Sequence, residues 1–276
     1  MQKALANSPG ILQGHDPWVW ESNISLYRTL PNNDTTTSPS SYASTLEGLL
    51  SNRKLFLVGD SLTRQWARTI HCELVHVLNK TVAQANAQVQ YVQVHDLRTS
   101  IPSGKFRKLL KPSKLDFVVW NTGHHVGPGK VNNWTEAYEE NMAVAHKRGG
   151  KATFGAVPDS HIFFRTTTIR HFLKGRGDWN TNTSEAGGAA PDMDARWSAY
   201  GGSSPAQPLQ NQIALHFLQR EGRFGLLDIS PMMLARADAS FDGSHICLPG
   251  PMTHWSRMLY YRIQQLDLRE KEGTQS

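Results

Sequence analysis

The chain has 276 residues, of which 39% are hydrophobic and 19% are charged, and its formal net charge is +6. These values are typical of a globular protein and exclude a disordered tail or a collagen-like repeat. Cys72 and Cys247 are the two cysteines, which excludes a disulfide-dense scaffold and a four-thiolate zinc site. The longest apolar runs have the length of strands, so no membrane span is expected, and residues 1–14 lack the apolar stretch of a signal peptide.

The hydrophobic pattern divides the chain into an N-terminal part and a region of alternating strands and helices. Residues 1–46 are expected to form an N-terminal extension and linker, because residues 32–46 are rich in Ser, Thr and Asn. Beyond them, strands are predicted at 54–58, 89–94 and 115–120, at either 152–157 or 162–164, and at 224–229. Helices are predicted at 62–78, 134–147, 209–221 and 252–268. This alternation predicts an α/β fold with a parallel sheet covered on both faces, whose active site lies at the carboxyl ends of the strands.

The first predicted strand ends in Gly59-Asp60-Ser61, which places Ser61 at the start of a helix. The free N–H groups and the dipole of a helix start favour a developing negative charge, which suits a nucleophilic serine. Serine is also a common helix N-cap, so a purely structural role is the alternative. The segment does not fit G-x-S-x-G, which excludes the nucleophile elbow of α/β-hydrolases.

A second polar group, Asn121-Thr122-Gly123, follows the predicted strand at 115–120. An Asn amide and a Gly backbone N–H at a strand end can donate hydrogen bonds to an oxyanion. Because Asn and Gly are also common turn residues, an ordinary turn is the alternative.

A third group, Asp242-Gly243-Ser244-His245, follows the last predicted strand. An aspartate three residues before a histidine can fix the imidazole tautomer, so that the other ring nitrogen acts as a base. The alternative is a turn with a surface histidine. Cys247 and His254 lie nearby but lack a second pair of ligands, so no metal site is expected.

The positive charge and the sequons bear on partners and compartment. The densest basic stretch, residues 105–114, lacks a nucleic-acid motif, so we interpret it as a solvated surface segment and expect no nucleic-acid partner. The chain carries Asn-x-Ser/Thr sequons at Asn23, Asn33, Asn79, Asn133 and Asn182. They favour a glycoprotein of the secretory pathway.

Four blocks of the chain, between about residues 53 and 262, resemble the trichome-birefringence-like/PC-esterase family in the order in which they occur. The blocks are Leu57–Trp66 (LVGDSLTRQW), Asp116–His125 (DFVVWNTGHH), Phe163–Phe172 with the following GDWNT at 177–181, and LDISP at 227–231 with DGSHICLPGP at 242–251 and Trp255. The chain differs from the family in His124-His125, where a Trp pair is usual, and in Ile246, which replaces a Trp. The Cys-rich N-terminal region of plant members is absent, so Cys72 and Cys247 pair with each other or stay free.

The resemblance implies an SGNH-hydrolase-like fold, a three-layer α/β/α sandwich with a mainly parallel sheet, and residues 47–276 as one catalytic domain. It also implies a serine-dependent O-acyltransferase, in particular one that transfers O-acetyl groups to polysaccharide hydroxyls through an acyl-Ser61 intermediate. A location in the Golgi lumen or outside the cell is implied, with membrane contact only through an anchor that this chain lacks.

The roles that follow are a catalytic Ser61, Asp242 and His245, and an oxyanion site formed by the Ser61 N–H and the Asn121 side chain, with Gly123 as second choice. Substrate-binding roles are expected for Arg64, Arg165, His124 and His171. The two arginines could instead form structural pairs, and His171 could be a core residue. Trp179 and Trp197, in a predicted long loop at 175–208, would either stack on sugar rings or pack in the core.

The expected partners are an acyl donor as co-substrate and a polysaccharide or oligosaccharide acceptor, with no permanently bound cofactor. A carbohydrate or lipid esterase would use the same catalytic residues, with water in place of the acceptor. A non-catalytic glycan-binding relative is the third alternative.

Overall fold

The structure of the chain is a computed structural model that describes residues 47–102, 105–127, 130–147, 153–169, 209–234, 239, 245–246 and 250–273. These residues belong to one compact unit, which begins at Thr45. Asp242, Cys247, His171 and the predicted long loop at 175–208, with Trp179 and Trp197, lie outside the described residues. Cys72 is an exposed free thiol.

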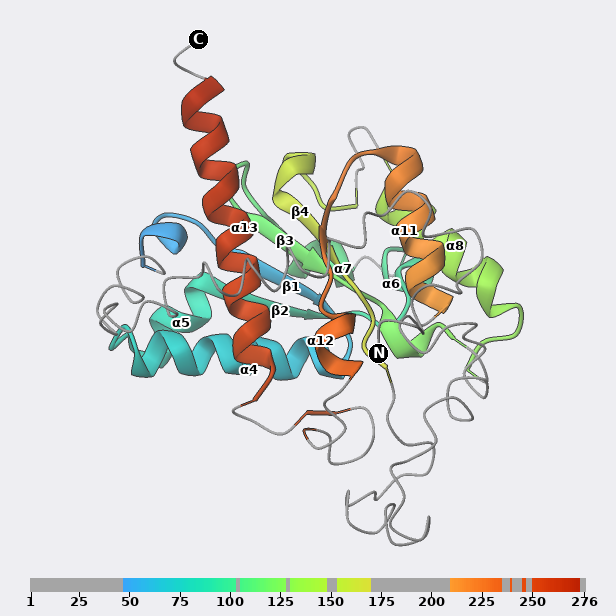
Figure 1. Ribbon diagram of the computed structural model, residues 1–276, viewed down its shortest axis with the longest axis horizontal. Coiled ribbons are helices and arrows are strands. Elements are labelled where there is room, and N and C mark those ends of the chain that lie inside the picture. Colours follow the sequence, from blue (N-terminus) through green and yellow to red (C-terminus); the bar gives the residue numbers. More distant parts are fainter. Residues whose placement is uncertain are drawn as a thin grey trace, which may run out of the picture. The chain divides into compact units, whose positions relative to one another are not determined.

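Five parallel strands form one sheet in the order β2-β1-β3-β4-β5 (Figure 1). The strands are β1 Leu55–Gly59, β2 Val89–Gln93, β3 Phe117–Trp120, β4 Ile162–Arg165 and β5 Gly225–Leu227. The predicted α/β class with a parallel sheet is therefore confirmed. Of the two ranges considered for the fourth strand, the one near residue 162 is correct. β1, β3 and β4 are buried along their whole length, as expected for parallel strands covered on both faces.

Helices follow the strands in the predicted order. They are α4 Ser61–His76, α5 Val82–Gln88, α6 Leu97–Ser100, α7 Lys105–Leu109, α8 Trp134–Ala145, α11 Leu209–Glu221, α12 Ser230–Leu234 and α13 Met252–Gly273. The four long helices match the predicted ranges closely. The short helices α5, α6, α7 and α12 were not expected, because segments of four to seven residues show too little periodicity.

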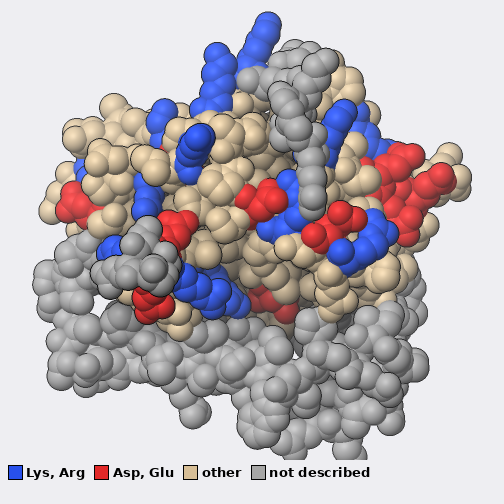
Figure 2. Space-filling view, turned by 90° about the horizontal axis from the view of Figure 1, so that it is seen from above, with Lys and Arg blue, Asp and Glu red and all other residues tan. Residues whose placement is uncertain are grey.

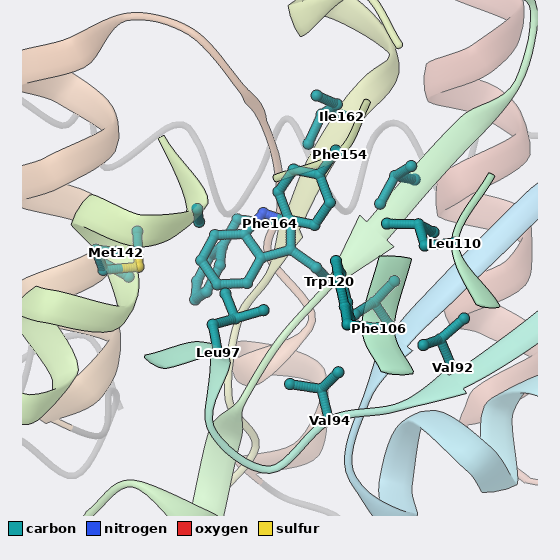
Figure 3. Close-up of a cluster of buried hydrophobic side chains, with 14 of the residues drawn as sticks. Val92, Val94, Leu97, Phe106, Leu110, Trp120, Met142, Phe154, Ile162 and Phe164 are labelled. Atoms are coloured by element: carbon teal, nitrogen blue, oxygen red, sulfur yellow. The ribbon is translucent and has the colours of Figure 1, made fainter. Parts of the chain in front are cut away.

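One face of the sheet is covered by α8 and α11 around a cluster of aromatic and aliphatic side chains (Figure 3). Trp120 on β3 lies in this cluster, with its ring 5.0 Å from that of Phe164 and 5.8 Å from that of Phe154. Phe106 and Leu110 also belong to it, so the basic stretch at 105–114 is anchored in the core by its apolar residues.

The opposite face of the sheet is covered by α4 and α13, which pack against each other. The Trp66 and Trp255 rings meet edge to face at 5.9 Å, and the Trp66 Nε1–H donates to Ser256 Oγ at 3.0 Å. Side chains alternate along a strand, so Leu55 and Leu57 face away from the cluster to which Phe56 and Val58 belong. Helices on both faces give the layering of an α/β/α sandwich.

The strand order places a topological switch point between β1 and β3. The chain leaves β1 through α4 and α5 to β2 on one side, and then crosses to β3 on the other side. In open parallel sheets, ligands bind beyond the carboxyl ends of the two strands that flank such a point. Ser61 follows β1 directly and Asn121 follows β3, so two of the predicted site residues lie there.

The described residues on the surface shown in Figure 2 form no extended patch of one charge. Lys and Arg side chains lie among Asp and Glu side chains over this face, with uncharged surface between them. Several of the basic side chains are paired with acids, among them Arg98 with Asp96 and Arg223 with Asp159.

Candidate active site

Ser61 and His245 meet at the carboxyl end of β1. Their side chains are separated by 184 positions in the chain, and the Ser61 Oγ lies 2.7 Å from the His245 Nε2. Both residues are half-buried. With the imidazole proton on Nδ1, the serine hydroxyl donates to Nε2, which is the arrangement of a nucleophile and its base.

The helix start at Ser61 is capped by the preceding residue. The Asp60 Oδ1 accepts hydrogen bonds from the Leu62 N–H at 3.1 Å and the Thr63 N–H at 3.2 Å, which makes Asp60 the N-cap of α4. The alternative that Ser61 itself is the cap is therefore wrong. Because a buried carboxylate satisfies these two amides, the serine hydroxyl is available to His245, and the Ser61 N–H is the first amide of the helix.

Asn121 is buried and its amide is engaged below the site. Its Nδ2 donates to the Arg165 carbonyl oxygen at 2.6 Å and to the Thr167 hydroxyl at 3.1 Å. Both amide hydrogens are thus used, and in this arrangement the side chain has none left for an oxyanion. The side chain ties the end of β3 to the end of β4, and this geometry favours a structural role for Asn121 over the expected donor role.

Arg165 is also buried beneath the site, with 1% of its surface exposed. Its Nη2 donates to the Thr63 hydroxyl at 3.2 Å and to the Asn121 Oδ1 at 3.3 Å, and lies 3.9 Å from the Asp60 carboxylate. Burial lowers the pKa of Arg165, and the nearby Asp60 opposes this shift. This geometry favours the structural alternative for Arg165 over its predicted contact with substrate.

Two glycines allow the strand ends and the helix start to approach each other. A Cβ at Gly59 would collide with the Thr63 hydroxyl and the Asn121 carbonyl oxygen. Gly123 has φ +41°, and a Cβ there would lie 2.8 Å from the Asp60 Oδ2. Gly123 therefore lies beside the capping carboxylate of Asp60, the residue that precedes Ser61.

Tyr91 on β2 supports the turn that carries Ser61, a role that the sequence did not indicate. Its hydroxyl lies 3.1 Å from the Gly59 carbonyl oxygen and 3.0 Å from that of Asp60. Burial, together with the charge of Asp60, raises the pKa of Tyr91 to about 12. The phenol therefore stays protonated and able to donate at all ordinary pH values.

Of the other predicted substrate-binding residues, Arg64 and His124 belong to the described part of the chain, and His171 lies outside it. Arg64 is exposed one turn into α4, on the same side of the helix as Ser61. His124 is half-buried and its Nε2 lies 3.4 Å from the hydroxyl of Thr168, three residues after the end of β4. Both are placed where a bound molecule could reach them.

Gln65 makes a contact next to His245 that periodicity alone could not reveal. Its side-chain Nε2 donates to the Ile246 carbonyl oxygen, and its Oε1 accepts from the Ile246 N–H, both at 3.1 Å. The residue is half-buried and sits one turn after Ser61 on α4.

A pair of stacked histidines lies at the same edge of the sheet. The rings of His95, after β2, and His125, after β3, are 3.9 Å apart with an angle of 7° between their planes. Burial lowers the pKa of His125, and His95, Lys130 and His245 lower it further, while Asp60 acts in the opposite direction.

The lowered pKa of His125 is expected to make the stability of the protein pH-dependent. A native pKa below the unfolded value means that the unfolded chain binds more protons, so stability falls as pH drops below about 6.5. We expect His125→Gln to reduce the loss of unfolding free energy between about pH 7 and pH 5, measured by urea denaturation. Equal pH dependence in the variant and the wild type would contradict this role of His125.

No protein-family model matches the chain, and no curated protein sequence matches it either. Within the described ranges, no three or more His, Cys, Asp or Glu side chains are grouped to hold a metal ion. None of the described helices combines the length and the apolar character needed to cross a membrane.

Proposed function

We propose that the chain is a serine-dependent O-acyltransferase that transfers an acyl group, in particular acetyl, to a hydroxyl of a polysaccharide or oligosaccharide. The observation that carries the proposal is the 2.7 Å contact between Ser61 Oγ and His245 Nε2 at the carboxyl edge of a parallel sheet. The resemblance of four sequence blocks to the trichome-birefringence-like/PC-esterase family supports the choice of reaction, and an SGNH-hydrolase-like fold is part of the proposal.

The first half of the reaction forms the acyl-enzyme. His245 Nε2 takes the proton of Ser61 as Oγ attacks the carbonyl carbon of the acyl donor, and a tetrahedral oxyanion forms. The protonated His245 then gives this proton to the leaving group as its bond to the acyl carbon breaks. Asp242 is proposed to hold the imidazole in the required tautomer.

We assign the oxyanion to backbone donors. The N–H of Ser61 stands at the start of α4, where the helix dipole favours negative charge, and the N–H of Gly123 is the second candidate because this residue packs against Asp60. One such donor typically contributes about 10²–10³-fold in rate. The engagement of the Asn121 amide supports this assignment over the side chain.

The second half of the reaction transfers the acyl group. His245 takes the proton of an acceptor hydroxyl, whose oxygen attacks the acyl carbon, and the bond to Ser61 Oγ breaks as Oγ regains a proton from His245. Arg64 and His124 are proposed to bind the acyl donor or the glycan. With water as acceptor, the same steps would make the protein an esterase.

A location in the secretory pathway belongs to the proposal. Of the five sequons, Asn79 and Asn133 lie in the described residues, and both are exposed with left-handed backbone conformations. Exposed turn positions of this kind are accessible to glycosylation, which supports the secretory assignment.

The test is an exchange assay with a chromogenic acetyl ester, in the presence and absence of an oligosaccharide acceptor, followed by mass spectrometry of the acceptor. We expect ester consumption to depend on the acceptor and the acceptor to gain the mass of one acetyl group. If ester is consumed while the acceptor mass never changes, the protein is an esterase and the transferase assignment is wrong. If no ester is consumed, the result contradicts the proposed enzyme and favours the alternative of a non-catalytic glycan-binding protein.

A further inference from the structure

We propose that Gln65 is a positioning residue, which holds His245 in the orientation that brings its Nε2 to Ser61. The inference rests on the proposed function, because it assigns a role within the same site. Gln65 acts through the backbone of Ile246, the residue that follows His245, with which it forms two hydrogen bonds.

The Gln65 side chain binds the backbone of Ile246 as a neighbouring peptide group would, with one hydrogen bond donated and one accepted. The amide of Gln65 donates to the Ile246 carbonyl oxygen and accepts from the Ile246 N–H, at 3.1 Å in both directions. Glutamine is suited to this because its neutral planar amide offers a donor and an acceptor side by side. Two such bonds fix the rotation of the peptide groups on either side of Ile246, and with it the direction in which the His245 side chain leaves the chain.

The anchor and the nucleophile share one helix. Ser61 and Gln65 are four residues apart on α4, so they lie one above the other on the same side of it. The helix is itself fixed to α13 by the Trp66–Ser256 hydrogen bond. The residue that contacts His245 and the residue that holds the backbone next to His245 are therefore separated by a single turn of the same helix.

Ile246 is held in place by its buried side chain as well as by the two hydrogen bonds from Gln65. Its side chain is buried, with 1% exposed, so the residue keeps its place in the core without Gln65. Loss of the Gln65 amide is therefore expected to free the backbone orientation rather than to detach the segment. A displacement of about 1 Å in a catalytic group can cost about 10²-fold in rate.

The first test compares Gln65→Met, which keeps the length of the side chain and removes the amide, with the wild type. We expect kcat for acyl turnover to fall about 10–100-fold, with KM changed less than about threefold, because the base is misplaced while the binding surface stays. The matched control is Gln84→Met on α5, where the glutamine forms a capping box with Thr81 at the exposed start of that helix. Its kcat should stay within about twofold of the wild type.

The second test uses the pH profile of Gln65→Glu. An ionised carboxylate accepts from the Ile246 N–H but repels the Ile246 carbonyl oxygen, whereas a protonated carboxyl can donate to it as the amide does. We expect the ratio of variant to wild-type kcat to rise as pH is lowered from about 8 to about 5. A merely structural role for Gln65 predicts a constant ratio, which would overturn the inference.

A crystal structure of Gln65→Met decides the inference without any activity. We expect the separation of Ser61 Oγ and His245 Nε2 to exceed hydrogen-bond distance in the variant, and an unchanged separation would overturn the role of Gln65. Wild-type kcat in Gln65→Met, together with loss of turnover in Ser61→Ala, would reject the positioning role alone. Turnover that survives Ser61→Ala would instead reject the proposed function.

Discussion

Replacement of Ser61 by alanine is expected to lower acyl turnover on the order of 10⁴–10⁶-fold, because the variant has no nucleophile to form the acyl-enzyme. The fold should survive, since the cap of α4 is the Asp60 carboxylate and not the serine hydroxyl. Initial rates with a chromogenic ester measure the first effect. Urea denaturation measures the second, for which we expect a change below about 1 kcal/mol.

The control for this substitution is Ser51→Ala, which removes an exposed serine hydroxyl in the turn before β1. Its rate and its unfolding free energy should both equal those of the wild type. His245→Ala should share the loss of turnover seen in Ser61→Ala, and the double variant should lose little more, because the two residues act as a unit. Independent, multiplicative losses would contradict the pairing of the two side chains.

Replacement of Arg165 by methionine is expected to lower the unfolding free energy by about 3–5 kcal/mol. The guanidinium is buried next to the Asp60 carboxylate, the Thr63 hydroxyl and the Asn121 side-chain oxygen. Burial lowers the Arg165 pKa in spite of the nearby Asp60, which means that desolvation disfavours the charged guanidinium at this position. The cost of the substitution comes from the buried carboxylate and polar oxygens that it leaves uncompensated.

Urea denaturation of Arg165→Met against the wild type measures this loss. Arg220→Met on α11 is the matched control, because the Arg220–Glu221 pair is largely exposed and should contribute less than about 1 kcal/mol. If Arg165→Met unfolds at the same urea concentration as the control, Arg165 does not hold the strand ends together. The assignment of this residue to the substrate would then be open again.

The arrangement of the sheet followed from sequence because its signals are long and periodic. The spacing of apolar residues in α4 and the continuous apolar run in β3 predict a helix and a doubly covered strand with little ambiguity. Short elements carry weaker signals. For α5, the useful one is local: Thr81 and Gln84 form a capping box, and the spacing of this pair is visible in the sequence.

The site was predicted in part, for a related reason. Strand order brings Ser61 and His245 to one edge, but it does not tell in which direction a polar side chain points. Asn121 follows the buried strand β3, and Arg165 ends the buried strand β4. Both side chains point inward, where the Asn121 amide donates to the Arg165 carbonyl oxygen and the Arg165 guanidinium donates to the Asn121 Oδ1. In the sequence, Gln65 cannot be distinguished from other polar residues of a helix, because its contact with Ile246 is 181 positions away in the chain.

The nucleophile and its base enter the growing chain far apart in time. At about 5–20 residues per second, the 184 positions between Ser61 and His245 correspond to a delay on the order of 10–40 s during synthesis. Throughout this interval the imidazole that contacts the Ser61 hydroxyl in the folded protein is not yet part of the chain. Under the proposed function, a nascent or truncated chain that ends before His245 would lack the base, and we expect it to turn over no acyl donor until its last segment has been synthesised.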